Sequence, residues 1–271
     1  MGGSALASAY EGHQLQGMSS DGTVYLEYSQ GTSKGSSAAA DLAVRLVSTI
    51  TGSITTIPIP STASAGSAIL SADGKTVVGT YYNDADNKQY SYRWTAGGGF
   101  VTFGTPEEAN VVAVSETGVS AGYYYDSETE SYVAAIWDAD GRTDAPTDTR
   151  FVATRASNIS RDASTVVGSL YVTNDDANTH AMVWDRENNT IRDIHTSTYV
   201  ASNATHVSAD GSVVAGRWDD ANGKSRVFRW TSDNETMQDI GSLVDDGYMY
   251  LTAMSDDGDV LVGYGLSENT L

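Results

Sequence analysis

A short phrase recurs six times along this chain and constrains its fold more than any other feature. In each copy an apolar residue and a serine lead into a short turn, and a hydrophobic segment that usually ends in glycine follows. A repeat of about 40 to 50 residues in a strand-rich sequence is typical of β-sheets stacked around an axis. The repeated serines are Ser19, Ser71, Ser115, Ser160, Ser208 and Ser255.

One copy, residues 65–104, shows the expected unit most clearly. An Asp-Gly turn at 72–75 and a polar loop at 83–88 separate β-branched and aromatic segments, which are strong strand signals. The unit therefore predicts a four-stranded antiparallel sheet, or blade. Its expected strands are residues 68–71, 76–82, 90–94 and 100–103.

Two columns of the repeat predict how the blades pack. Adjacent apolar residues in the second strand, such as Val77-Val78 and Val166-Val167, indicate that both faces of the sheet are buried. A tryptophan recurs in the third strand, and we expect it to lie in the core between blades. The members of this column are Trp94, Trp137, Trp184 and Trp230.

The predicted fold class is therefore all-β: a β-propeller of about six four-stranded antiparallel blades. The first blade is degenerate, because Glu27 stands where later copies have glycine. The last is expected to be incomplete, because only two strands fit after Ser255. Residues 1–10 are interpreted as a leader or an added start, and residues 11–271 as a single propeller domain.

Composition limits the function classes. The 15 basic and 35 acidic residues give a net charge of −20, which disfavours binding to nucleic acid. No apolar run is long enough to cross a bilayer, so direct membrane insertion of this region is not expected. The chain has no cysteine, which excludes disulfides, thiolate catalysis and cysteine-ligated metals.

Several phrases resemble the HAF-type extracellular repeat of bacterial surface proteins. They are Ser71–Gly79, Arg226–Thr231 and Met237–Leu243. The Asp-Gly turn is also similar to the WD40-like repeats of TolB-type propellers. The HAF resemblance implies an extracellular or cell-surface location, including passenger regions of autotransporters, and it implies no catalytic residues.

Tyrosines provide the candidate ligand-binding residues. Tyr82, Tyr125 and Tyr171 stand three residues after the repeat glycine in three successive blades. A tyrosine combines a large apolar ring with a polar tip, which suits recognition of a glycan or a protein. The competing interpretation is packing of a partly buried outer strand.

Acidic hairpin loops provide the candidate metal ligands. Carboxylate clusters supply the oxygen ligands that Ca²⁺ prefers, so calcium is the one cofactor that the sequence suggests. The competing interpretation is an ordinary solvated turn, since none of the loops has the full EF-hand pattern. The candidate ligands are Asp84, Asp86, Asp175, Asp176, Asp219 and Asp220.

No catalytic set can be assembled from the sequence. The four histidines, His13, His180, His195 and His206, are interpreted as scattered, and no pair has the spacing of a helical zinc site. The sequence therefore favours a non-catalytic extracellular module that displays loops and blade edges to a glycan or protein. The alternatives are a glycan-active enzyme of the sialidase or lyase type and a purely structural spacer.

Overall fold

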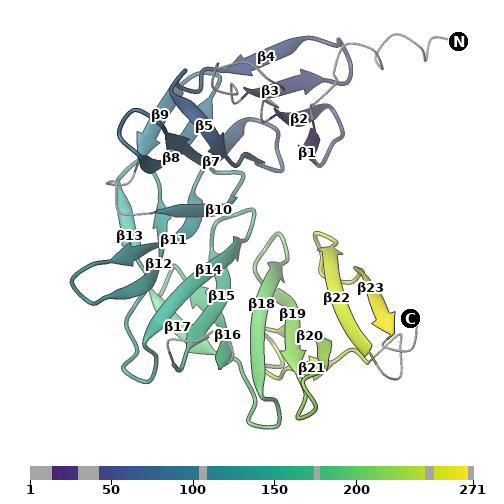
Figure 1. The fold of residues 1–271 in the computed structure, drawn as a ribbon. Helices are drawn as coiled ribbons and strands as arrows, with labels where there is room; N and C mark the ends of the chain where they lie inside the picture. The colour runs from purple at the N-terminus through teal and green to yellow at the C-terminus, as the bar shows by residue number, and fades with distance from the viewer. Residues whose placement is uncertain (1–13, 30–42, 104–108, 174–177, 242–246, 268–271) are drawn as a thin grey trace, which may run out of the picture. The chain divides into compact units, whose positions relative to one another are not determined.

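The computed structural model describes residues 14–29, 43–103, 109–173, 178–241 and 247–267, and every regular element in these ranges is a β-strand (Figure 1). The described residues thus contain no helix of the length and apolarity that a bilayer crossing requires. Residue contacts divide the chain into two compact units, residues 1–111 and 112–271. The expected leader, residues 1–10, lies outside the described residues, and the single-domain boundary stays a prediction.

The first unit contains two blades. Blade 1 is a complete four-stranded sheet, and it consists of β1 (Gln14–Met18), β2 (Val24–Ser29), β3 (Ala43–Ser48) and β4 (Ile54–Ile57). The strands of blade 2 are β5 (Ala63–Gly66), β6 (Ile69–Leu70), β7 (Thr76–Asn83), β8 (Lys88–Thr95) and β9 (Gly99–Phe103).

The first strand of blade 2 differs from the single strand expected at 68–71. It is split into β5 and β6, which both pair with β7. Between them, the backbone N–H of Ser67 donates to the carbonyl oxygen of Thr80 at 2.8 Å, and the Ser67 hydroxyl accepts the Thr80 N–H at 3.1 Å. A side chain therefore takes a place in the ladder and interrupts its regular pairing.

The remaining blades repeat the same order of antiparallel neighbours. Blade 3 consists of β10 (Asn110–Val114), β11 (Ser120–Asp126), β12 (Ser131–Trp137) and β13 (Arg142–Asp144). Blade 4 consists of β14 (Ala153–Ile159), β15 (Thr165–Tyr171), β16 (Thr179–Asp185) and β17 (Thr190–Asp193). Blade 5 consists of β18 (Ala201–Val207), β19 (Val213–Asp219), β20 (Ser225–Thr231) and β21 (Gln238–Asp239). Among the described residues, blade 6 contains β22 (Gly247–Met254) and β23 (Leu261–Ser267).

Neighbouring blades within each unit bury their faces against one another, as the sequence predicts. Val166 and Val167 are both fully buried, and they belong to two different clusters, one shared with blade 3 and one shared with blade 5. Adjacent residues of a strand point to opposite faces, so blade 4 has a core on each side. The four tryptophans of the third-strand column are at most 8% exposed, which confirms their place in the core.

The repeated serine is the hydrogen-bonding centre of each first turn. The buried Ser208 hydroxyl donates to the Asp210 carboxylate at 2.7 Å and accepts the backbone N–H of Val213 at 2.9 Å. Ser115 accepts the Val119 N–H in the same way, with Thr117 in place of the aspartate. The serine and aspartate therefore satisfy polar groups where the chain reverses direction.

The repeat glycine is required by a close approach of two strands. A Cβ atom at Gly168 would lie 2.0 Å from the carbonyl oxygen of Arg155, and one at Gly216 would lie 2.0 Å from that of Asn203. Both contacts occur where the first strand is bulged against the second. Glu27, which occupies this column in blade 1, is itself buried.

Candidate functional site

Loops of two kinds meet at the same end of each blade. Because the strands alternate in direction, the hairpin between the second and third strands lies at the end where the chain passes to the next blade. The Ser-Asp turns lie at the opposite end. Function on such scaffolds is concentrated in loops held by rigid strands, so the end with the hairpins and connections is the natural place for a site.

The three candidate tyrosines have different surroundings. Tyr82 is 38% exposed, and its hydroxyl donates to Asn87 Oδ1 at 3.4 Å. Tyr125 makes an edge contact with Tyr132 at 5.4 Å. Tyr171 is only 8% exposed, with the guanidinium of Arg155 4.8 Å from its ring centroid. A binding role for the row stays a prediction, and Tyr171 would need a neighbour to move before it could contact a ligand.

In the acidic loop of the first unit, both candidate carboxylates accept hydrogen bonds from residues nearby. Asp84 accepts the Ser64 hydroxyl at 2.6 Å, and Asp86 accepts the Tyr90 hydroxyl at 2.5 Å. Each carboxylate thus stabilises its own hairpin or the strand beside it.

The blade 5 loop behaves in the same way, because Asp219 accepts the Ser225 hydroxyl and Asp220 accepts the backbone N–H of Lys224. Asp175 and Asp176 lie outside the described residues. Across the described residues, no group of three histidine, aspartate or glutamate side chains is arranged to hold a metal ion. These hydrogen bonds favour the competing interpretation of ordinary hairpin turns, and calcium binding by the loops stays untested.

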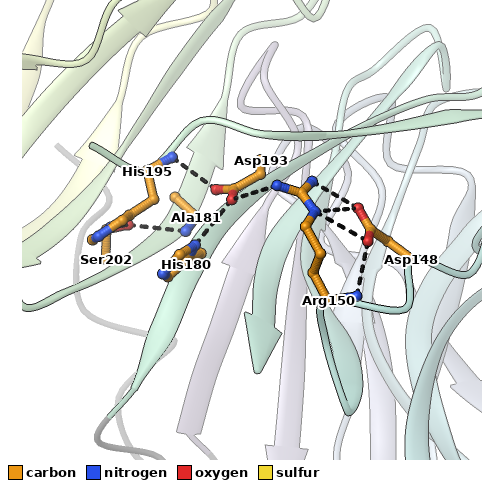
Figure 2. A network of polar contacts seen from close by, with 7 residues as sticks. All are labelled: Asp148, Arg150, His180, Ala181, Asp193, His195 and Ser202. Atoms are coloured by element: carbon orange, nitrogen blue, oxygen red, sulfur yellow. Dashed lines mark hydrogen bonds and ion pairs between the residues drawn. The ribbon is translucent and has the colours of Figure 1, made fainter. Parts of the chain in front are cut away.

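The structure brings together two histidines that the sequence analysis treated as scattered. The imidazole rings of His180 and His195 stack with centroids 3.9 Å apart and planes 16° apart. Figure 2 shows them beside Asp193 and Ser202. His180 Nδ1 lies 3.0 Å from Asp193 Oδ2, and His195 Nδ1 lies 2.8 Å from Ser202 Oγ. The interpretation of these two histidines as separate was wrong.

Strand register explains the pairing and could have revealed it. In blade 4, β16 pairs with β17 so that Met182 lies opposite Asp193. Continuing this register by two residues places His180 opposite His195. The turn that joins the strands, at 186–189, is visible in the sequence as Arg-Glu-Asn-Asn. The sequence signal that would have revealed this contact is the register of the hairpin, whereas only the residue spacing of a helical metal site was tested.

An ion-pair network extends the histidine pair toward blade 3. Asp193 Oδ2 also lies 3.8 Å from Arg150, whose guanidinium forms a close pair with Asp148 at 2.7 Å (Figure 2). Phe151 makes an edge contact with His180 at 5.5 Å. The connection between blades 3 and 4 is thus fixed onto the start of β16 by both charge and aromatic packing.

The stacked rings do not form a shared metal site. A metal lies close to the plane of each imidazole that binds it, about 2.1 Å from the nitrogen. Two planes only 16° apart meet far beyond that distance. Burial, and next the neighbouring His180, lower the pKa of His195, so its neutral form is favoured. This geometry suits hydrogen bonding and stacking.

A hollow of about 340 Å³ adjoins the network, and we name it the acidic hollow. Its lining includes Asp126, Asp144 and Asp148 together with the rings of Tyr124, Tyr132 and Phe151. Hydrogen bonds from Thr129 lower the pKa of Asp126, and the Arg150 side chain lowers that of Asp148. Both carboxylates are therefore ionised at neutral pH and accept hydrogen bonds.

Tyr124 closes one side of the acidic hollow. Its hydroxyl donates to Asp144 Oδ2 at 3.1 Å, and the Arg142 guanidinium lies 4.0 Å from its ring centroid. Burial, and next the Asp144 charge, raise the pKa of Tyr124 to about 12. The phenol thus stays a hydrogen-bond donor, held in place by the outer strand β13.

Comparisons with known proteins identify the fold class. No model of a known protein family matches the sequence, and no curated protein matches it. Among solved structures, the chain is similar to a TolB-like protein from Agrobacterium tumefaciens, with 15% identity, a TM-score of 0.57 and coverage of 84% of this chain and 80% of that one. It is also similar to TolB from Acinetobacter baumannii, with 12% identity, a TM-score of 0.55 and coverage of 89% of this chain and 63% of that one. A third similar structure is an oligogalacturonate lyase in complex with manganese, with 13% identity, a TM-score of 0.63 and coverage of 93% of this chain and 70% of that one.

The chain is therefore an all-β propeller protein. The neighbours include TolB-type propellers, as the Asp-Gly turn predicted, and identities at this level establish the fold alone. The HAF resemblance stays a prediction, because none of these comparisons carries it.

Proposed function

We propose that the protein is a non-catalytic binding module of a bacterial secreted or cell-surface protein, and that the acidic hollow binds a hydroxyl-rich glycan. The observation that carries the proposal is the lining of the hollow: ionised carboxylates beside aromatic rings, held on the strand ends of blade 3 and on the connection to blade 4. Carboxylates accept hydrogen bonds from sugar hydroxyls, and aromatic rings contact the apolar face of a sugar. A hollow of this size matches ordinary small-ligand sites.

Charge favours one class of glycan. Asp126, Asp144 and Asp148 line the hollow, Arg142 and Arg150 pair with the last two, and the chain has a net charge of −20. Like charges would repel a uronate or a phosphorylated sugar. Neutral or amino sugars are therefore the expected ligands. A surface location is supported by the absence of cysteine and by the resemblance to extracellular repeats.

A glycan array read in parallel with a turnover assay tests this proposal. We expect saturable binding to neutral or amino glycans without product, lost in Asp126→Asn and Phe151→Ala. The matched control is Asp140→Asn, because Asp140 lies in an exposed turn outside the hollow. Asparagine at 126 can still accept the Glu128 N–H, so the variant should remain folded. Binding that survives both hollow variants would contradict the assignment of the site.

A second candidate function is catalytic, and the pair of His180 and Asp193 favours it. A carboxylate on Nδ1 orients an imidazole so that Nε2 can transfer a proton. Product release in the turnover assay, lost in His180→Gln, would establish a glycan-active enzyme and exclude the non-catalytic module. Absence of any glycan or protein ligand would instead leave the spacer interpretation.

A further inference from the structure

An arginine fills the groove between blades 3 and 4, at the end of the blades where the Ser-Asp turns lie. Arg186 Nη1 donates a hydrogen bond to the carbonyl oxygen of Ala163 at 2.6 Å, and its Nη2 lies 3.7 Å from the Asp138 carboxylate of blade 3. The Arg186 side chain is only 22% exposed. This groove therefore holds a guanidinium between a carbonyl oxygen of one blade and a carboxylate of the neighbouring blade.

The next groove along the chain, between blades 4 and 5, has an equivalent backbone. Gly211 stands where Ala163 does, since each is the third residue after the repeated serine, with φ of 76° and 65°. Ser232 stands where Arg186 does, because each follows the third-strand tryptophan by two residues. Each also donates its backbone N–H to the carbonyl oxygen of the residue after Gly211 or Ala163, at 2.9 and 3.0 Å. The two grooves thus differ in their side chains and not in their hydrogen-bonding pattern.

The carboxylate of the groove is retained, but the arginine is not. Asp185 directly follows Trp184, as Asp138 directly follows Trp137. Because a short serine replaces the arginine, a hollow of about 270 Å³ is present between blades 4 and 5. We name it the blade 4–5 hollow. Its lining includes Asp185, Arg192, Gly211, Trp230, Ser232 and Glu235.

The charges around the blade 4–5 hollow leave one carboxylate without a cation. Arg192 forms an ion pair with Glu235, and these side chains are 50% and 58% exposed, so this pair lies on the solvent side of the hollow. Among the residues that the structure describes, Asp185 forms no ion pair. Hydrogen bonds from Asn188 lower the pKa of Asp185, so its carboxylate is ionised at neutral pH. The hollow therefore has a net negative charge that a cation would balance.

The equivalent hollow of the first unit lacks this chemistry. It lies between blades 1 and 2 and has a volume of about 460 Å³. Ser48 stands there in the place of Asp185, since each lies opposite the first residue of the second strand of its blade. The lining contains no carboxylate, and it includes Lys75. A site for a cation is thus a property of blades 4 and 5 and not of every groove in this fold.

We propose that the blade 4–5 hollow binds an arginine side chain of a basic partner protein. The guanidinium would donate to the carbonyl oxygen of Gly211 and pair with Asp185, as Arg186 does with the equivalent groups one blade earlier. The hollow is smaller than ordinary small-molecule sites of about 300–1,000 Å³, which suits a single side chain. The net charge of −20 attracts a basic partner. The planar guanidinium also fits a carboxylate better than the ammonium group of lysine does.

NMR titration of the full chain with the peptide acetyl-Gly-Gly-Arg-Gly-Gly-amide tests the proposal. We expect saturable shifts of the Gly211 amide and the Trp230 indole at millimolar peptide, because both residues line the hollow. A peptide with citrulline, which has a similar shape and no charge, should bind at least about tenfold more weakly. A lysine peptide should also bind more weakly. Absence of saturable shifts, or equal binding of the citrulline or lysine peptide, would overturn the proposal.

Two substitutions test the residues of the hollow. Asp185→Asn can still accept the Asn188 N–H but has no charge, and it should weaken binding of the arginine peptide at least about tenfold. Ser232→Arg introduces the side chain that blade 4 has at this position, so it should fill the hollow, abolish binding and raise the melting temperature. Asp140→Asn is the matched control, because Asp140 lies in an exposed turn of blade 3. Melting temperatures check that each variant is folded. Undiminished binding in Asp185→Asn or in Ser232→Arg would contradict the site.

Discussion

His180 and His195 stack at 3.9 Å between ring centroids, although the chain reverses direction between them. The stack joins the third strand of blade 4 to the connection that leads into blade 5. One ring is hydrogen-bonded to Asp193 and the other to Ser202, the second residue of β18. Two rings held this closely cannot both carry a proton without repulsion.

Stability should therefore depend on pH through His195. Burial, followed by the His180 ring, lowers its pKa below the usual value of 6.5, and the weaker opposite effect of Asp193 does not reverse this. The folded state thus binds the proton less readily than the unfolded chain. The stabilisation is complete above about pH 6.5 and is lost as the pH falls through the folded pKa.

Melting temperatures measured between pH 7.5 and 4.5 check this prediction. His206 is partly buried, and this burial lowers its pKa as well, so it contributes to the same slope. We expect His195→Gln to remove part of the decline and His206→Gln to remove another part. An unchanged slope in His195→Gln would show that the stacked pair does not carry the effect.

Removing the repeated serine from a buried turn should destabilise the protein. Ser208→Ala leaves the backbone N–H of Val213 without its side-chain acceptor at a point where both residues are buried, at an expected cost of about 1–3 kcal/mol. Ser255 makes the same bond at 2.9 Å in a solvent-exposed turn, where water can replace the lost group. Chemical denaturation should therefore show a smaller loss for Ser255→Ala, and equal losses would contradict the role of burial.

The repeat glycine should not tolerate a methyl group. Gly216→Ala places a Cβ 2.0 Å from the carbonyl oxygen of Asn203 and 2.8 Å from the ring of Phe228. Strands must shift to relieve this contact, and we expect a loss of about 1–3 kcal/mol in the free energy of unfolding. Gly97→Ala is the control, because nothing lies within 4 Å of the position that its added methyl group would occupy. Equal stability of the two variants would argue against the close approach.

Calcium should leave the melting temperature unchanged. The carboxylates of Asp84, Asp86 and Asp220 are already hydrogen-bonded within or beside their own hairpins. A ligand that binds only the folded state raises the melting temperature as its concentration increases. Melts in millimolar Ca²⁺ and in chelator check this expectation. A rise that depends on Ca²⁺ would support the acidic loops as metal sites.

Much of the fold could be predicted because the same pattern of strands and turns occurs several times in the sequence. The pair Val166-Val167 predicted a strand buried on both faces, and both residues are fully buried. The same pattern fails at Leu261-Val262, where Val262 is 54% exposed. Apolar residues at a given position of the repeat show which side chains a strand could bury. Whether a neighbour covers it depends on the rest of the structure.

The candidate site was predicted less well. Tyr125 and Tyr171 occupy the same column, but Tyr171 lies beneath Arg155 whereas Tyr125 lies against Tyr132. The residues that line the acidic hollow, such as Asp148 and Phe151, come from a connection outside the repeat pattern. Comparison of repeats cannot detect such residues, because they have no equivalents in other copies.

The amino-acid sequence alone determined the antiparallel blade, its serine turn and its tryptophan core, because each depends on interactions between residues near one another in the chain or on a repeated apolar pattern. Only the tertiary structure decided that His180 meets His195, that Asp148 and Asp126 share a hollow, and that Val262 of blade 6 is exposed whereas Val167 of blade 4 is buried. Those relationships depend on strand register and on packing between separate segments, which local sequence does not specify.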